Sequence, residues 1–213
     1  MNKNNAILTG LYAITDSALM PGERLMEKTE AALRGGCRIL QYRNKNANST
    51  DRKREAGLLR TLCHRYQSLL IINDDMELAL QVGADGIHIG QSDTSLAQVR
   101  KQVGDQIIVG ISCHDNITLA LQAQQGGASY VAFGRFFESH TKPHAPAADV
   151  AVLSRAKKTL KIPIVAIGGI TRDNAMRVIT QGADMIAVIH DLFSPNDVHE
   201  IEQRARTFAR LFS

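Results

Sequence analysis

Eight short apolar segments alternate with helix-like segments along the chain, and this regular alternation restricts the folds that the chain can adopt. The apolar segments are rich in Ile, Val, Leu and Tyr, as is typical of strands buried on both faces of a parallel sheet. The expected strands span residues 11–15, 39–43, 69–73, 86–89, 107–112, 130–134, 164–168 and 185–189. The expected helices include residues 24–34, 51–66, 96–103, 116–125, 172–181 and 198–211. Strict alternation of this kind predicts a doubly wound sheet or a closed barrel.

A weak glycine repeat favours the barrel. Glycine ends a helix-like segment just before the second, fourth, sixth and eighth strands, at Gly35-Gly36, Gly83, Gly126-Gly127 and Gly182. At such a point glycine supplies the left-handed conformation that commonly ends a helix. Four strand–helix–strand–helix units then make an α/β fold, a single compact (β/α)8 TIM barrel over residues 1–213. A doubly wound fold stays open, although no G-x-G-x-x-G motif follows the first strand.

Composition and charge argue against several classes of partner. The formal net charge is +4, aromatic residues make up 5% of the chain, and Trp is absent. Acidic and basic residues interleave, as in Asp51-Arg52-Lys53-Arg54-Glu55, which indicates a solvated helix face rather than a nucleic-acid surface. No apolar run is long enough to span a bilayer, and the polar start lacks the apolar region of a signal peptide. We therefore expect no nucleic-acid or membrane partner, and a homo-oligomer is compatible with the sequence.

The cysteines indicate a cytoplasmic location. Cys37, Cys63 and Cys113 are odd in number and irregularly spaced, so they do not form a disulfide framework. Neither Cys63-His64 nor Cys113-His114 has a second ligand at a spacing typical of zinc sites. We expect these cysteines to pack as small apolar residues.

A basic cluster follows the second expected strand and an acidic cluster follows the third. They are Gln41-Tyr42-Arg43-Asn44-Lys45 and Asn73-Asp74-Asp75. Arg and Lys bind phosphate oxygens through charge-assisted hydrogen bonds, and carboxylates hold the Mg²⁺ that bridges such oxygens. Because strand ends converge on one mouth of a barrel, the two clusters predict a site for a metal-bound diphosphate. Gln41, Arg43 and Lys45 alternate along the strand and its exit, so all three could project toward that mouth; a solvated strand end is the alternative.

Asp74 and Asp93 are the expected Mg²⁺ ligands. Asp93 lies in Gly90-Gln91-Ser92-Asp93, directly after the fourth strand. Mg²⁺ commonly takes one or two carboxylates and completes its octahedron with water and substrate phosphates. Asn and Asp are also favoured helix N-caps, and we expect Asp75 to have a capping or supporting role.

The remaining strand ends carry further candidates for binding. Ser112 can donate to a substrate and His114 could serve as an acid, base or orienter. The loop after the sixth strand, residues 133–143, carries hydroxyls and Lys142, which suit an anion cradle or a lid; a plain surface loop is the alternative. The exits of the seventh and eighth strands, at Gly169 and at Ile189-His190, form the common phosphate site of (β/α)8 enzymes. We find no nucleophile–base pair, so diphosphate is expected to be a leaving group when two small molecules are joined.

Together these motifs closely resemble the thiamine phosphate synthase family over nearly the whole chain. The resemblance rests on the set of short motifs at residues 10–16, 41–45, 72–75, 88–93, 110–112, 139–142 and 166–170. It implies a transferase of thiamine biosynthesis that couples hydroxymethylpyrimidine diphosphate to a thiazole phosphate, or to its carboxylate, with Mg²⁺ as cofactor. In the family, the pyrimidine passes through a carbocation-like state before the thiazole nitrogen attacks.

The resemblance also implies roles for individual residues. The residues implied to bind the pyrimidine diphosphate are Gln41, Tyr42, Arg43, Asn44, Lys45, Asn73, Ser112 and Lys142. Among these, Arg43, Lys45, Ser112 and Lys142 would act in catalysis, and Asp74 and Asp93 would bind the metal. The residues implied to surround the thiazole phosphate are Ser139, His140, Thr141, Gly169, Ile189 and His190. Arg135, Ser139 and His190 depart from the commoner family pattern, which is proline, threonine and serine at these positions.

Two other functions stay open. A thiazole tautomerase-like isomerase would use the same barrel and a group such as His114, but it would not need the Mg²⁺–diphosphate residues. A non-catalytic barrel could bind thiazole or thiamine phosphate as a sensor. The presence of Arg43, Lys45, Asp74 and Asp93 favours the synthase over both.

Overall fold

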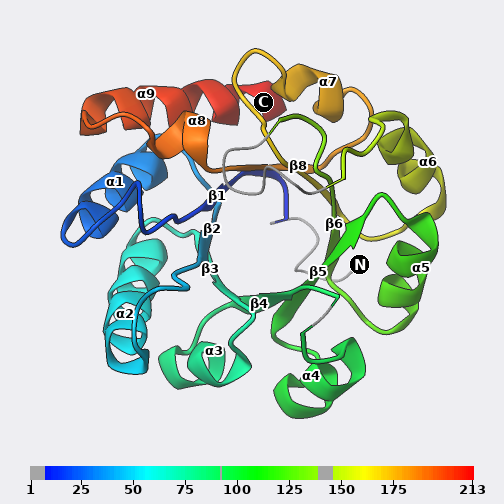
Figure 1. Ribbon diagram of the computed structural model, residues 1–213, viewed down its shortest axis with the longest axis horizontal. Coiled ribbons are helices and arrows are strands. Elements are labelled where there is room, and N and C mark those ends of the chain that lie inside the picture. Colours follow the sequence, from blue (N-terminus) through cyan, green and yellow to red (C-terminus); the bar gives the residue numbers. More distant parts are fainter. Residues whose placement is uncertain (1–7, 92, 139–145) are drawn as a thin grey trace.

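The computed structural model describes residues 8–91, 93–138 and 146–213, and it forms a closed barrel of eight parallel strands (Figure 1). The strands are β1 (Gly10–Ile14), β2 (Ile39–Tyr42), β3 (Leu69–Asn73), β4 (Gly86–Ile89), β5 (Ile108–His114), β6 (Tyr130–Phe133), β7 (Ile164–Ile167) and β8 (Met185–Val188). Each strand pairs with the next, and β1 pairs with β8 to close the sheet. The predicted barrel is confirmed, and the expected strands differ from the observed ones only at their ends.

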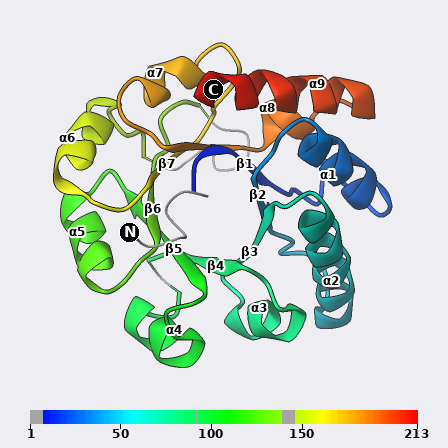
Figure 2. The same ribbon diagram turned by 180° about the vertical axis from the view of Figure 1, so that it is seen from behind.

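Helices surround the barrel on its outer side (Figures 1 and 2). They are α1 (Arg24–Arg34), α2 (Ser49–Arg65), α3 (Met76–Val82), α4 (Leu96–Val103), α5 (Ile117–Gln125), α6 (Ala151–Thr159), α7 (Ala175–Ile179), α8 (His190–Phe193) and α9 (Val198–Ala209), followed by a 3-10 turn, η2 (Arg210–Phe212). The first and last units are joined by Lys28 of α1, a buried lysine that donates to the Phe193 carbonyl oxygen at 2.9 Å. None of the helices in the described ranges is long and apolar enough to cross a membrane.

The expected starts of α2 and α7 differ most from the observed ones, and local hydrogen bonds explain why. Helix α2 begins at Ser49, earlier than expected, because the Asn48 side chain caps it and accepts from the Asp51 N–H at 2.9 Å. Helix α7 is shorter than expected because Asn174 accepts from the Thr171 N–H at 2.9 Å and holds the preceding residues in a turn. The glycine prediction is confirmed: Gly36, Gly83, Gly127 and Gly182 all have positive φ, between 63° and 109°.

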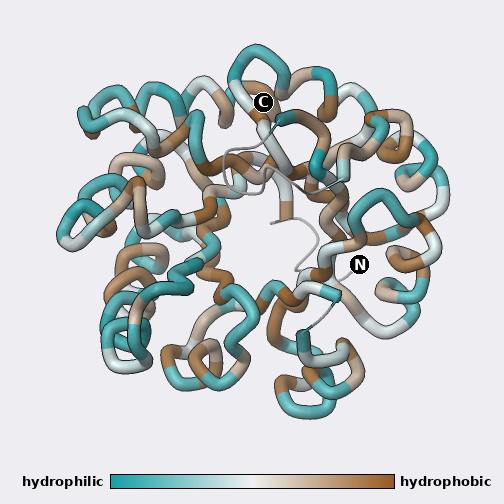
Figure 3. The backbone as a smooth tube through the Cα atoms, viewed as in Figure 1, coloured by the Kyte–Doolittle hydropathy of each residue, from teal (hydrophilic) through white to brown (hydrophobic). Residues whose placement is uncertain are grey.

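The apolar residues form two cores on opposite faces of the sheet. The larger core lies between the strands and the helices, where Figure 3 shows the apolar helix faces turned toward the barrel. The smaller one fills the barrel interior with inward side chains at alternate strand positions, such as Tyr12, Ile39 and Tyr130. Polar side chains also lie in this interior: Gln41 is 4% exposed and His88 is 9% exposed.

The Tyr130 ring occupies the interior because β5 carries a glycine opposite it. A Cβ atom added at Gly110 would lie 2.0 Å from Tyr130 Cζ and 2.3 Å from its hydroxyl oxygen. No real Cβ approaches another atom so closely, and the ring is fully buried, so it has little room to move. Gly110 is thus required for the interior packing.

Gly110→Ala is therefore expected to lower the free energy of unfolding by about 1–3 kcal/mol, as overpacked core substitutions do. The measurement is chemical denaturation of the purified variant. Gly57→Ala is the matched control, since a Cβ at Gly57 meets nothing within 4 Å, and in helix α2 it should stabilise by roughly 0.5–1 kcal/mol. Equal effects of the two substitutions would contradict this role for Gly110.

Candidate active site

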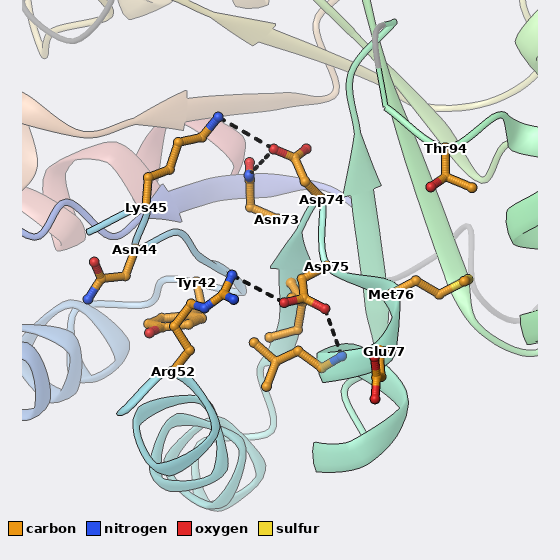
Figure 4. A pocket seen from close by; sticks show the side chains of 12 residues that line it. Tyr42, Asn44, Lys45, Arg52, Asn73, Asp74, Asp75, Met76, Glu77 and Thr94 are labelled. Carbon is orange, nitrogen blue, oxygen red and sulfur yellow. Dashed lines mark hydrogen bonds and ion pairs between the residues drawn. The ribbon is translucent and has the colours of Figure 1, made fainter. Parts of the chain in front are cut away.

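Basic and acidic side chains from β2 and β3 meet in a cavity of about 580 Å³ beside the barrel mouth (Figure 4). Of the residues predicted to bind substrate or metal, it is lined by Tyr42, Asn44, Lys45, Asn73 and Asp74. It is lined in addition by Arg52, Ile72, Asp75, Met76, Glu77, Leu78 and Thr94. The two clusters that follow successive strands in the sequence are therefore neighbours in space.

Asp74 is the centre of this group. Its carboxylate accepts a hydrogen bond from the Asn73 amide at 2.6 Å and lies 3.7 Å from the Lys45 ammonium (Figure 4). Its backbone is left-handed, with φ 61°, a conformation that Asp adopts more readily than most residues. Burial raises the pKa of Asp74, and so do the negative charge of Asp93 and the hydrogen bond that a protonated Asp74 can donate to it, so the two predicted metal ligands interact with each other.

The donor set suits a magnesium ion. Two adjacent carboxylates, one half-buried and one exposed, repel each other when both are ionised, and a divalent cation between them would remove that repulsion. Asp93 Oδ2 also accepts from the Gly90 N–H at 2.6 Å, which fixes its position at the end of β4. No cluster of three or more His, Cys, Asp or Glu side chains suited to a metal occurs in the described ranges. The remaining ligands of a cation here would be water and substrate, as is usual for Mg²⁺.

Asp75 caps helix α3, as predicted. Its side chain accepts from the Leu78 N–H at 3.0 Å, and it forms an ion pair with Arg52 of α2 at 3.2 Å (Figure 4). The cap and the ion pair attach the loop that carries Asp74 to two helices. Asp75 is therefore engaged with α3 and α2 and has the capping role that was predicted for it.

Glu55 of helix α2 holds the basic loop after β2. Its carboxylate accepts from the Tyr42 hydroxyl at 2.7 Å and from the Asn44 amide at 3.1 Å. Burial and the bond to Glu55 raise the pKa of Tyr42, so this hydroxyl stays protonated and donates. Tyr42 and Asn44 thus turn their polar groups toward α2, and they position Lys45 at the cavity.

A second cavity, of about 270 Å³, forms the mouth of the barrel. The predicted site residues that line it are Gln41, Arg43, Asn73, Ser112, Gly169, Ile189 and His190. Asn73 lines both cavities, so they adjoin. Gln41 and Arg43 project toward the mouth as predicted, whereas Lys45 lines the neighbouring cavity. The Arg43 backbone is fixed by Thr15, whose hydroxyl oxygen accepts from the Arg43 N–H at 2.8 Å.

A bulge at the end of β5 separates three consecutive side chains. The register with β6 shifts between Ser112 and His114, and His114 has a φ of 52°. Ser112 and His114 consequently both line the mouth, whereas Cys113 is buried in the outer core. Burial raises the pKa of the Cys113 thiol to about 12, in accordance with the expected packing role.

The exits of β7 and β8 lie together on another side of the mouth. Asp191 joins them, since its carboxylate accepts from the Arg172 N–H at 3.1 Å and pairs with the Arg172 guanidinium at 3.1 Å. Gly169 has a φ of 64°, and a Cβ there would lie 2.1 Å from the Glu138 carbonyl oxygen. The absence of a side chain at Gly169 therefore lets the backbone of the loop after β6 pack closely against it. Ser139, His140, Thr141 and Lys142 lie outside the described residues.

Comparisons of the sequence with known proteins show its family. The sequence model described as thiamine monophosphate synthase matches residues 11–192. The chain is 52% identical, over 205 residues, to the thiamine-phosphate synthase of Alcanivorax borkumensis, covering 96% of this chain and 94% of that one. The chain belongs to the thiamine monophosphate synthase family.

Solved structures agree with this assignment. The thiamine phosphate pyrophosphorylase of Pyrococcus furiosus is 31% identical and superposes with a TM-score of 0.86 over 99% of both chains. A thiamine phosphate pyrophosphorylase from Bacteroides thetaiotaomicron is similar in fold, with a TM-score of 0.68 at 18% identity, covering 95% of this chain and 96% of that one. The family and the barrel predicted from the motifs are thus confirmed.

Several residues hold the loops of this site without having been predicted to do so. The roles of Glu55 and Asp191 were not predicted because both lie in helices, and only the tertiary structure brings them to the loops that they hold. Tyr12, His88 and Tyr130 were missed although a signal was present. Each is a polar residue at an inward position of an otherwise apolar strand, where burial requires a hydrogen-bond partner.

Asp93→Asn is expected to raise the Mg²⁺ concentration needed for half-maximal activity by at least about tenfold. Substitution of a residue that only supports a metal ligand already lowers metal affinity by about this factor. The asparagine oxygen can still accept from the Gly90 N–H, so the fold is expected to persist. Asp105→Asn, an exposed change between α4 and β5, is the charge-matched control. An unchanged Mg²⁺ requirement in Asp93→Asn would show that the metal assignment is wrong.

Glu55→Ala is expected to lower the free energy of unfolding by about 1–3 kcal/mol, because it leaves two buried or half-buried donors without an acceptor. It is also expected to raise KM for the diphosphate substrate, since the Lys45 loop loses its anchor. Glu55→Gln keeps an acceptor oxygen and should lie close to wild type in both measurements. Similar behaviour of the two variants would contradict the anchoring role.

Proposed function

We propose that the chain catalyses the joining of hydroxymethylpyrimidine diphosphate and a thiazole phosphate to give thiamine phosphate and diphosphate. In this transfer the bond from the pyrimidine methylene carbon to the diphosphate oxygen breaks, and a bond from that carbon to the thiazole nitrogen forms. The observation that carries the proposal is the cluster of Lys45, Asn73, Asp74 and Asp93 beside the mouth cavity, in a chain of this family. We propose small-molecule substrates and a cytoplasmic location.

The pyrimidine diphosphate would extend from the mouth cavity into the adjoining one. Gln41 and Ser112 would contact the pyrimidine end, and Arg43, Lys45, Asn73 and Lys142 the diphosphate. Asp74 and Asp93 would hold Mg²⁺, which would supply positive charge to the leaving diphosphate. The adjacency of the two cavities at Asn73 supports this placement.

The side chains would act by position and charge, without a covalent intermediate. Arg43 and Lys45 would stabilise the negative charge that grows on the diphosphate as it leaves, which is the kind of interaction that lowers a barrier most. Holding the thiazole nitrogen in line with the pyrimidine carbon can contribute roughly 7–11 kcal/mol. The apolar part of the mouth, with Ile14, Val165 and Ile189, would keep water from capturing the carbocation-like state.

The thiazole phosphate would lie at the exits of β7 and β8. Gly169, Ile189 and His190 line that side of the mouth. The family resemblance implies Ser139, His140 and Thr141 as further residues around the thiazole phosphate. His190 replaces a smaller residue of the family, so its backbone rather than its side chain would serve the phosphate.

A tautomerase-like isomerase would need only an acid–base group, and exposed His114 at the mouth is the residue available for it. It would have no use for the paired Asp74 and Asp93 or for Lys45. These residues favour the synthase, and they favour it equally over a barrel that only binds thiazole or thiamine phosphate.

The direct test measures diphosphate release and thiamine phosphate formation from both substrates, with Mg²⁺ and then with EDTA. Equal amounts of the two products, lost on chelation and restored by Mg²⁺, are expected. Tight binding of the thiazole phosphate without release of diphosphate would favour the sensor, and conversion of one thiazole isomer into another would favour the isomerase.

A further inference from the structure

A continuous chain of hydrogen bonds crosses the barrel interior beneath the mouth. The Gln41 amide nitrogen donates to the Tyr12 hydroxyl at 2.8 Å, and the Tyr12 and Tyr130 hydroxyls lie 2.8 Å apart. The Tyr130 hydroxyl lies 3.0 Å from His88 Nδ1, and His88 Nε2 lies 3.0 Å from the Ser112 hydroxyl. These five side chains come from five different strands, β2, β1, β6, β4 and β5.

Both ends of this chain reach the mouth cavity, which Tyr12 and His88 also line, whereas Tyr130 at its centre is sealed from the cavity. Gln41 and Ser112 line the cavity, and Tyr130 is fully buried and does not line it. The Tyr130 ring lies edge-on to Tyr12 and is stacked on His88, and Gly110 leaves the space for it. Packing therefore holds the middle members in place, and the hydroxyl protons are the parts left to reorient.

Tyr12 and Tyr130 each have one proton to donate, and a neutral His88 has one N–H donor and one acceptor nitrogen. A tyrosine hydroxyl has one proton, and burial raises the pKa of Tyr12 and of Tyr130, so both stay protonated. Gln41 donates to Tyr12, so the arrangement in which every hydroxyl proton is bonded within the chain has Tyr12 donating to Tyr130 and Tyr130 donating to His88 Nδ1. A neutral His88 then carries its proton on Nε2 and donates to Ser112, so the Ser112 proton points to another acceptor.

The opposite direction requires every bond to reverse. If Gln41 turned its amide oxygen toward Tyr12, the tyrosines and His88 would each donate the other way. The Ser112 proton would then be directed at His88 Nε2, and its oxygen would only accept from a ligand. The orientation of one amide at one end thus decides whether the hydroxyl at the other end donates into the cavity.

We propose that Tyr12, Tyr130 and His88 are positioning residues that couple the amide orientation of Gln41 to hydrogen-bond donation by Ser112. In the direction present here, Gln41 keeps its amide oxygen for a ligand N–H and Ser112 keeps its proton for a ligand acceptor. A ligand with a donor group at Gln41 and an anionic or lone-pair acceptor at Ser112 fits this state, as an amino-substituted heterocycle that carries a diphosphate does. The identity of the ligand in this inference rests on the proposed function, whereas the direction of the hydrogen bonds does not.

The first test reads the proton arrangement without any substrate. ¹⁵N NMR of histidine-labelled protein, with the His88 signal assigned from His88→Gln, is expected to show His88 with its proton on Nε2. Tyr130→Phe removes the donor to Nδ1 and is expected to give a mixture of the two neutral forms. Tyr66→Phe, which removes a hydroxyl bonded to Glu30 outside the barrel, should leave the signal unchanged. A proton on Nδ1 in the wild-type protein, or a signal unaffected by Tyr130→Phe, would overturn the proposal.

The second test is a double-mutant cycle on the rate of product formation. Tyr130→Phe is expected to lower kcat/KM roughly three- to tenfold in the wild type, the usual effect of one lost hydrogen bond. In the Ser112→Ala background it should lower kcat/KM less than about twofold, because the hydroxyl through which it acts is absent. The same factor in both backgrounds would show that Tyr130 serves only the packing. An enzyme inactive with both substrates would sink the proposed function, while the NMR result would still decide the proton arrangement.

Discussion

The hydrogen bonds between β1 and β8 are the constraint on which the rest of the structure depends. They close the sheet, and a closed sheet of parallel strands must place all eight carboxyl ends around one mouth. Lys45, Asp74 and Asp93 follow three different strands, and no local interaction could assemble them. Closure does so, and the buried Lys28 strengthens it by joining α1 to α8. The candidate site is therefore a consequence of topology first and of individual side chains second.

The acidic part of the site keeps a local arrangement that is unfavourable by itself. The negative charge of Asp93 raises the pKa of Asp74, and Asp74 keeps a left-handed backbone that costs a non-glycine residue of order 1 kcal/mol. The surroundings offset these costs: the Asp74 N–H donates to the His88 carbonyl oxygen at 2.9 Å, and Asp75 anchors the loop to α3 and α2. Unfavourable local geometry of this kind is typical of functional sites, where the rest of the fold stabilises it.

Much of this architecture could be predicted from the sequence, because it depends on local patterns. Apolar runs gave the strands, glycines marked the helix ends, and polar clusters after the strands marked the mouth. The limits of α2 and α7 were wrong because single side chains, Asn48 and Asn174, decide where those helices begin. Glu55, Asp191 and the chain from Gln41 to Ser112 could not be derived from local patterns. Their partners lie on other strands or helices, and the packing of helices on strands, together with barrel closure, brings them within hydrogen-bond distance.

The paired carboxylates are proposed to be the metal-binding part of a diphosphate site. The most direct measurement is a crystal structure of the protein with Mn²⁺ and hydroxymethylpyrimidine diphosphate, in which anomalous scattering locates the metal. The account predicts one Mn²⁺ between Asp74 and Asp93 that also contacts diphosphate oxygens, with Lys45 and Arg43 on the same diphosphate. A metal bound elsewhere, or a diphosphate that contacts neither carboxylate-bound metal nor Lys45, would contradict it.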